Sequence, residues 1–286
     1  MLTLLFDGIA YGMLLFVLAV GLAVTLGLMN FVNLAHGAFA MAGGYVTVLL
    51  MERAGVPFLA TLPLAFMLPA IVGAVAERTL YRPMYKRPHL DHVLFSIGLV
   101  FMAVSAVDYL VGSQQQIIKL PEFLQGRFEI AGVGIGRYRL FIVIVCLVLT
   151  AILQLVLART RFGSRLRAAV DDPRVAGGLG INVPQVFALT FAFGCGLAGL
   201  GGALGAEILG LDPHFPLKFL IYVLIVVSVG GTSTVTGPFL AALLLGIGDV
   251  VGKYYVPNLG AFVIYAMMIA LLLWRPHGLF GRVAAR

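Results

Sequence analysis

The apolar residues of this chain are gathered into nine runs, most of them long enough to cross a membrane. The runs fall at 5–28, 32–51, 58–77, 92–111, 139–158, 184–206, 219–231, 236–254 and 258–274. Because lipid offers the backbone no hydrogen bonds, spanning segments of this length should be helices. We therefore expect an all-α polytopic membrane protein with a single transmembrane domain, residues 1–286, built as a bundle of about 8–10 helices, some of them broken.

Composition excludes an ordinary soluble domain. Hydrophobic residues make up 61% of the 286 positions and charged residues 11%, with a mean hydropathy of +1.06. Soluble domains carry roughly a quarter charged residues. The N-terminus has no basic residue before its apolar run and no small-residue cleavage site, so the first span is expected to be retained. Cys146 and Cys195 lie within apolar runs and are expected to be packing residues.

The positive charges are unevenly distributed along the chain. Four of the 19 Lys and Arg residues lie within 78–87, five lie within 159–174, and three arginines follow residue 274. Basic loops of membrane proteins stay in the cytoplasm, so the C-terminus and the loops 78–91 and 159–181 are predicted to be cytoplasmic. This clustering also argues against nucleic acid as a partner, despite a net charge of +7. The segment 112–138 becomes the longest external connection, either an ordered cap or hairpin or an unstructured loop.

The polar segment 159–181 interrupts the apolar sequence and shows the turn chemistry of two short helices. Gly163 and Ser164 are expected to start the first helix at Arg165. Asp172 before Pro173 predicts an N-cap for the second helix, which three glycines then end, at 177, 178 and 180. Four apolar residues are expected to form an exposed knob: Val175, Ala176, Leu179 and Ile181. The alternative is a plain loop whose arginines only set the topology.

Three sequence matches, in order along the chain, resemble one family. The run NFVNLAHGAF at 30–39, followed by GGY at 43–45, is similar to an N-terminal signature of permeases of branched-chain amino-acid ABC importers. VAGGLGIN at 175–182 and the helix after it resemble the coupling loop of that family, and WRPHGLFG at 274–281 resembles its C-terminal motif. The first match favours the H-type over the M-type subunit. The chain departs from the pattern at Ala38, where an acid is common, and at Gly44, where alanine is usual.

The resemblance implies a transmembrane permease subunit of an ATP-driven importer that works by alternating access. Its solutes would be branched-chain amino acids or related small polar solutes, namely amides, urea and small acids. Its partners would be an M-type permease subunit, two cytoplasmic ABC ATPases, which bind the ATP and Mg, and an extracytoplasmic solute-binding protein. The location would be the bacterial cytoplasmic (inner) membrane. The residues that would couple to the ATPases are Arg165, Arg167, Asp171, Asp172, Val175, Ala176, Leu179, Gly180 and Ile181.

The first motif places polar groups and glycines at membrane depth, where polar side chains usually face a watery path or a bundle interior. The candidate translocation path is Asn30, Asn33, His36, Gly37, Gly43, Gly44 and Tyr45. The alternative is that Asn33 and His36 tie helices together. His36 has no Cys, Asp or Glu at helical spacing, so a metal site is not expected.

Several smaller patterns also make predictions. Small residues recur every four positions at Gly194, Ala198, Gly202 and Ala206, which indicates a close-packing face toward this chain or a second permease subunit. Asp249 and Lys253 are spaced to pair on a helix. The hydroxyl-rich stretch 232–236 is expected to be a turn rather than a path-lining break. Charges at Glu207, Asp212 and His214 are either solvated loop charges or contacts for a solute-binding protein.

An enzyme is the least favoured class. GDVVGKY at 248–254 has three residues between its glycines instead of four and a tyrosine in place of the Ser or Thr that holds magnesium, so it is not a nucleotide-binding loop. We expect no catalytic residues and no cofactor in this chain. The main alternative from another class is an ATP-independent channel or secondary transporter, which would need intramembrane carboxylates that the chain mostly lacks.

Overall fold

A computed structural model describes residues 1–29, 33–130, 133–231, 234–276 and 278–279. Nine helices in this part of the chain correspond to the nine apolar runs. They are α1 (Leu2–Met29), α2 (His36–Ala54), α3 (Phe58–Ala76), α4 (His89–Val111), α5 (Arg137–Arg159), α8 (Val183–Leu209), α9 (Phe215–Gly230), α10 (Thr236–Tyr255) and α11 (Gly260–Trp274). Within the described residues, six helices are long and apolar enough to cross a membrane, and α9 and α11 are shorter apolar helices. The predicted class, an all-α polytopic membrane protein, is confirmed.

Shorter elements fill the connections. A π-turn (Glu77–Tyr81) and a 3-10 turn (Arg82–Lys86) extend α3, and two further 3-10 turns lie at Glu122–Leu124 and Pro257–Leu259. The strands β1 (Arg127–Ile130) and β2 (Val133–Gly136) pair antiparallel, with Arg127 opposite Gly136. The connection 112–138 therefore contains the ordered hairpin that was one of its two expected forms. The helices α6 (Arg161–Asp171) and α7 (Pro173–Gly178) occupy the polar segment between α5 and α8.

Small residues set how the long helices pack. α1 and α8 are mostly buried and form the centre of the bundle. α1 runs antiparallel to α10, since a side-chain carbon placed on Gly8 would lie 2.7 Å from Ile247 and one on Gly12 would lie 2.6 Å from Ala242. Glycine is needed where backbones approach this closely. At these two positions α1 is thereby held against α10 with no room for larger side chains.

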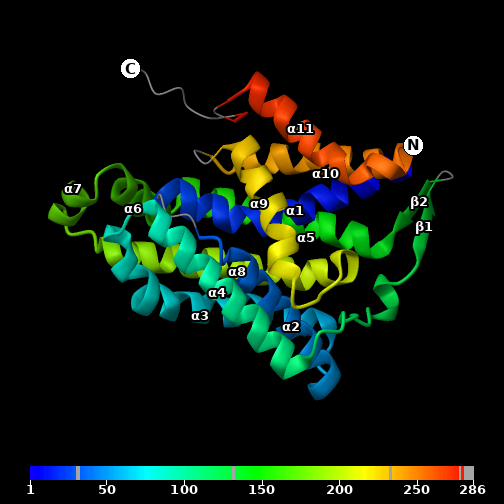
Figure 1. Cartoon of the computed structure of the whole chain (residues 1–286), viewed down its shortest axis with the longest axis horizontal. Coiled ribbons are helices and arrows are strands. Elements are labelled where there is room, and N and C mark those ends of the chain that lie inside the picture. The colour runs from blue at the N-terminus through cyan, green and yellow to red at the C-terminus, as the bar shows by residue number, and fades with distance from the viewer. Residues whose placement is uncertain (30–32, 131–132, 232–233, 277, 280–286) are drawn as a thin grey trace.

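The molecule has two distinct ends along its long axis. Figure 1 shows α1, α5, α8 and α10 running along this axis, with α6 and α7 at one end and the β1–β2 hairpin at the other. Arg78 and Arg82 line a cavity with Asn182 and Pro184 at the start of α8, close to the end of α7. The backbone N–H of Leu279 donates a 2.8 Å hydrogen bond to the carbonyl of Val229, near the end of α9. The described parts of the three basic segments therefore lie at the same end of the bundle, while Arg282 and Arg286 lie outside the described residues.

Candidate functional site

The helix α6 begins at Arg161, four residues before the start that was predicted from Gly163 and Ser164. Thr160 is its N-cap, and the side-chain hydroxyl of Thr160 accepts a 3.3 Å hydrogen bond from the backbone N–H of Gly163. The predicted start at Arg165 was wrong, because a threonine that bonds a free N–H of the first turn is the stronger start signal. Gly163 instead lies inside α6, where a side-chain carbon would be 2.1 Å from the carbonyl oxygen of Leu157. This contact presses α6 against the last turn of α5.

One face of α6 is buried and the other is basic. Leu166 and Ala169 are 1% and 0% exposed and pack with Val186 of α8. Arg165 and Arg167 are exposed and flank Leu166 on its two sides. The guanidinium of Arg167 donates to the carbonyl of Leu157, one of the carbonyls that the end of α5 leaves without a helical partner. Arg167 therefore joins α6 to α5 as well as contributing charge.

The helix α7 follows the predicted cap chemistry. Oδ1 of Asp172 accepts hydrogen bonds from the backbone N–H groups of Arg174, at 2.8 Å, and Val175, at 3.0 Å. Pro173 occupies the first helical turn, where its missing N–H is not needed. The helix ends at Gly178, and Gly180 adopts φ +84°, a left-handed conformation that favours glycine. The prediction of a second short helix with an Asp172 cap and a glycine end is confirmed.

The apolar surface of α7 is smaller than the predicted knob. Val175 is 58% exposed and Leu179 is 77% exposed. Ala176, however, is 2% exposed, and Ile181 is half-buried against the apolar cluster that α6 forms with Val186 of α8. Placing Ala176 on the exposed knob was wrong, because this side chain lies on the buried side of α7. The exposed apolar pair is Val175 and Leu179.

Asn33 and His36 make specific contacts with other helices. Oδ1 of Asn33 accepts a 2.9 Å hydrogen bond from the Tyr81 hydroxyl and a 3.1 Å bond from the backbone N–H of Ala35. Nε2 of His36 lies 2.9 Å from the carbonyl oxygen of Leu18 in α1. Both side chains are almost fully buried. In this structure these two residues tie α1, α2 and the end of α3 together, while Asn30 lies outside the described residues.

The glycines of the same motif are contact points between backbones. A side-chain carbon on Gly43 would lie 2.1 Å from the carbonyl oxygen of Gly199, and one on Gly37 would lie 2.9 Å from Cα of Pro216. Gly44 would meet Leu211 at 2.8 Å. Tyr45 is 4% exposed, and its hydroxyl has no hydrogen-bond partner among the described residues. The candidate path residues of α2 are thus closely packed in this structure.

The predicted packing face of α8 points into the same chain. Gly194, Ala198, Gly202 and Ala206 are all buried. A side-chain carbon on Gly194 would lie 3.1 Å from the carbonyl oxygen of Gly21, and one on Gly202 would lie 1.8 Å from that of Ala40. The face therefore receives α1 and α2 instead of a neighbouring subunit.

A cavity of about 440 Å³ lies where α6 meets the bundle. Its walls come from α1, α5, α6 and the turn before α10, and its lining residues are Ala23, Val24, Gln154, Leu157, Ala158, Gly163, Leu166, Arg167, Thr234, Val235 and Thr236. Thr232 and Ser233, from the same hydroxyl-rich stretch, lie outside the described residues. The described part of this stretch forms a turn, in which Oγ1 of Thr234 accepts a 3.3 Å hydrogen bond from the N–H of Gly237.

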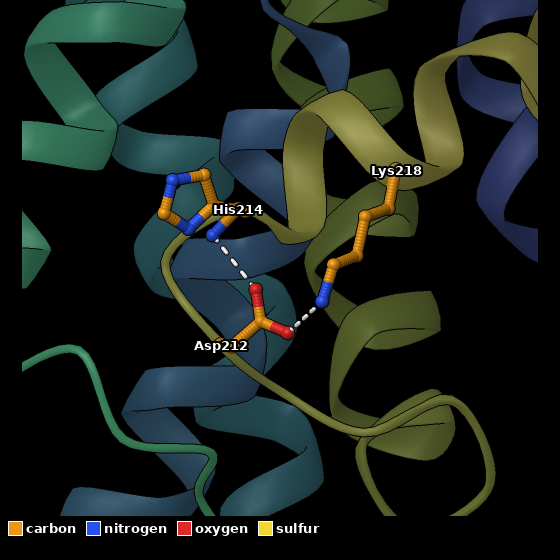
Figure 2. A network of polar contacts seen from close by, with 3 residues as sticks. All are labelled: Asp212, His214 and Lys218. Carbon is orange, nitrogen blue, oxygen red and sulfur yellow. Dashed lines mark hydrogen bonds and ion pairs between the residues drawn. The ribbon is translucent and has the colours of Figure 1, made fainter.

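A second polar group lies at the start of α9. Figure 2 shows Asp212 between two donors: the backbone N–H of His214, 2.8 Å from Oδ1, and the ammonium of Lys218, which reaches Oδ2. The His214 ring points away from this carboxylate. Lys218 was missed from the sequence, although a lysine three residues into an apolar helix was a usable signal. Glu207 is exposed near the end of α8.

The predicted pair in α10 is confirmed: Nζ of Lys253 lies 2.5 Å from Oδ2 of Asp249. Asp249 is 1% exposed, and its Oδ1 has no hydrogen-bond partner in the described part of the chain. Cys146 and Cys195 are free and buried, as predicted. Among the described residues, no group of three or more His, Cys, Asp or Glu side chains is arranged to hold a metal ion.

Comparison with known proteins agrees with the three sequence motifs. The profile of the family described as "Branched-chain amino acid transport system / permease component" matches residues 4–272. The chain belongs to this family. No solved structure matches it.

Individual members of this permease family align with nearly the whole chain. The "High-affinity branched-chain amino acid transport system permease protein BraD" of Pseudomonas aeruginosa is 29% identical, covering 97% of this chain and 95% of its own length. LivH of Escherichia coli is 27% identical, covering 97% and 94%. LivM of E. coli is 25% identical and is covered over 68% of its length. The permease is therefore LivH-like, and its relatives are transport permeases.

Proposed function

We propose that this permease is the H-type transmembrane subunit of an ATP-driven importer that moves branched-chain amino acids, or related small polar solutes, into the cytoplasm. The observation that carries the proposal is the α6–α7 pair, which presents exposed Val175 and Leu179 at the basic end of a membrane bundle. An exposed apolar pair beyond the spans fits a protein partner. The names of BraD and LivH support the choice of solute.

The proposed partners are those that the family resemblance implies. Two cytoplasmic ABC ATPases would supply the ATP and Mg, one of them docking on α7 of this chain. An M-type permease would complete the membrane part as a heterodimer, and an extracytoplasmic binding protein would deliver the solute at the hairpin end. The α6–α7 end is then cytoplasmic, the loop 112–138 extracytoplasmic, and the whole chain one transmembrane domain of the cytoplasmic (inner) membrane. The positive-inside rule supports this orientation.

The contacts of α6 and α7 provide a route for coupling. Closure of the ATPases would displace α7, which continues through Asn182 into α8. α6 would follow, since Leu166 packs on Val186 and Arg167 binds the end of α5. Alternating access would arise from the resulting tilt of α5 and α8 relative to α1. The cavity between α1, α5 and α6 would change its volume in the same step.

Reconstitution tests the proposal. The permease, an M-type subunit, the two ATPases and the binding protein are combined in liposomes, and uptake of labelled leucine is followed with and without ATP. Import should require ATP and every component, and Leu179→Asp should abolish it while the chain still inserts. Leu273→Asp, at an 81% exposed position in the last turn of α11, serves as a control for surface changes. Leucine transport by the chain alone, without ATPases, would instead identify a channel or secondary transporter.

A further inference from the structure

The start of α9 lies near the middle of the bundle. Gly37 packs against Pro216, and the neighbouring His36 binds the carbonyl of Leu18 in the second half of α1. A side-chain carbon on Gly21 would touch both His36 and Gly194, and Gly194 lies two positions before Gly196, the midpoint of α8. Pro216 is therefore level with the central part of α8, and α9 begins well inside the membrane.

The residues just before α9 also lie at the depth of the central part of the bundle. Leu211 packs on Gly44, where a side-chain carbon would also lie 3.3 Å from the carbonyl oxygen of Gly202. Gly202 is six positions beyond the midpoint of α8, about 9 Å at a rise of 1.5 Å per residue. Half of a hydrocarbon core is about 15 Å. Asp212 lies between these two levels, so its carboxylate and the paired Lys218 lie at hydrocarbon depth.

The described part of the chain encloses most of the Asp212 side chain, which is 16% exposed, but leaves its partner open. In Figure 1, α9 crosses in front of α1 and α8 at a steep angle, near the middle of the long axis. The side chain of Lys218 is 58% exposed, and His214 is exposed beside it. An ammonium and a carboxylate at this depth do not face lipid, because desolvating them is too costly; such groups face a watery cavity or path. The exposed side of α9 therefore borders water in the assembled transporter.

The pair has capacity for a further ligand. Lys218 has three N–H donors and uses one on Asp212, while a carboxylate offers about four acceptor positions and that of Asp212 uses two. Among the described residues the buried hydroxyl of Tyr45 has no hydrogen-bond partner, and Tyr45 follows Gly44, which packs on Leu211 beside Asp212. A donor left unsatisfied at this point is what a bound polar solute would complete.

The outer loop covers this place from the hairpin end. The backbone N–H of Gln116 donates a 2.7 Å hydrogen bond to the carbonyl of Leu211, and a side-chain carbon on Gly210 would lie 2.3 Å from the Gln115 amide. The outer loop therefore contacts the residues just before Asp212, while Lys218 stays exposed along α9.

We infer that Asp212, Lys218 and Tyr45 form a solute-contact site on the wall of the translocation path, built for an α-amino carboxylate. The Lys218 ammonium receives the solute carboxylate, Asp212 receives its ammonium, and Ile221, 47% exposed one turn along α9, borders its aliphatic side chain. This inference rests on the import function proposed above. It moves the solute contact away from the packed glycines of α2.

Thiol labelling in the complete reconstituted transporter tests the exposure to water. Ile221→Cys should react with a charged, membrane-impermeant methanethiosulfonate reagent, and leucine should slow the reaction at least threefold. Ile152→Cys is the matched control: Ile152 is 50% exposed on the apolar outer face of α5 and should stay unreactive. The native cysteines are buried. Equal, low reactivity at both positions overturns the inference.

Transport by charge variants tests the role of the pair. Lys218→Met should lower leucine uptake at least tenfold, while the binding protein still stimulates the ATPases to the wild-type rate. The double variant Asp212→Asn/Lys218→Met leaves no unpaired charge and keeps the test valid if the single variant folds poorly. Normal uptake by the double variant overturns the inference. Failure of the wild type to import leucine would contradict the proposed function instead, and the labelling result would still decide whether α9 faces water.

Discussion

The hydroxyl of Tyr81 donates a 2.9 Å hydrogen bond to Oδ1 of Asn33 and so joins two segments 48 residues apart. Tyr81 is 0% exposed and Asn33 is 1% exposed, so the bond lies in the interior. It fixes the chain just before α2, at the place where α2 begins inside the bundle instead of at its surface.

Asn33→Ala should lower the stability of the permease by about 1–3 kcal/mol, because it removes the acceptor of a buried hydrogen bond. Thermal unfolding of the detergent-solubilised protein measures the change. Tyr81→Phe should have a smaller effect in the same direction, since Asn33 keeps its bond from Ala35. Reduced uptake by Asn33→Ala with an unchanged unfolding temperature would favour a path-lining role over a helix tie.

Gly202→Ala should greatly reduce the yield of folded protein. Its added carbon would lie 1.8 Å from the carbonyl oxygen of Ala40, so two backbones must separate. Overpacking of this kind costs about 1–3 kcal/mol or more. Gly98→Ala is the control, because a side-chain carbon at Gly98 in α4 meets no described residue within 4 Å. A monodisperse size-exclusion peak for Gly202→Ala at wild-type yield would contradict the close packing of α2 on α8.

Gly180→Arg should abolish uptake without preventing membrane insertion. Gly180 has φ +84°, and a residue with a side chain costs roughly 1–2 kcal/mol in that conformation. The turn that presents Leu179 should therefore rearrange. Uptake and membrane content are measured together, with Gly177→Ala, at an open position of α7, as the control. The coupling role of this turn is rejected if Gly180→Arg transports at the wild-type rate.

Lys253→Met should destabilise the permease by about 1–3 kcal/mol, since it leaves the buried Asp249 carboxylate without its cation. The double variant Asp249→Leu/Lys253→Met should recover most of this loss, because neither charge then remains buried. The comparison is made by unfolding in mixed detergent micelles. Additive losses in the double variant would show that the two side chains do not act as a pair.

The apolar runs were sufficient to place the nine helices, because a spanning helix needs a length of apolar sequence that few other structures share. The Asp172 cap could also be predicted from the sequence, since capping depends on residues only two or three positions apart. The start of α6 was misplaced by four residues, because Thr160 competed with a glycine and a serine that looked equally suitable.

The depth and burial of individual side chains could not be predicted from the sequence. Nothing local shows that residues 210–214 fold back toward the centre of α8, so Asp212 and His214 looked like loop charges at the outer end. Ala176 looked exposed because its burial depends on how a six-residue helix meets its neighbours. The bond between Tyr81 and Asn33 joins residues from different segments, and only the tertiary structure brings them together.

The glycines of α8 also determine what kind of movement the bundle can make. Gly194, Gly199 and Gly202 bring α8 within contact of the backbones of α1, α3 and α2 in turn, without a layer of side chains between them. Side chains can change rotamer to absorb a small shift, whereas touching backbones cannot. Under the proposed coupling, a displacement applied at Asn182 would therefore move α8 as a rigid body and act on three helices at once.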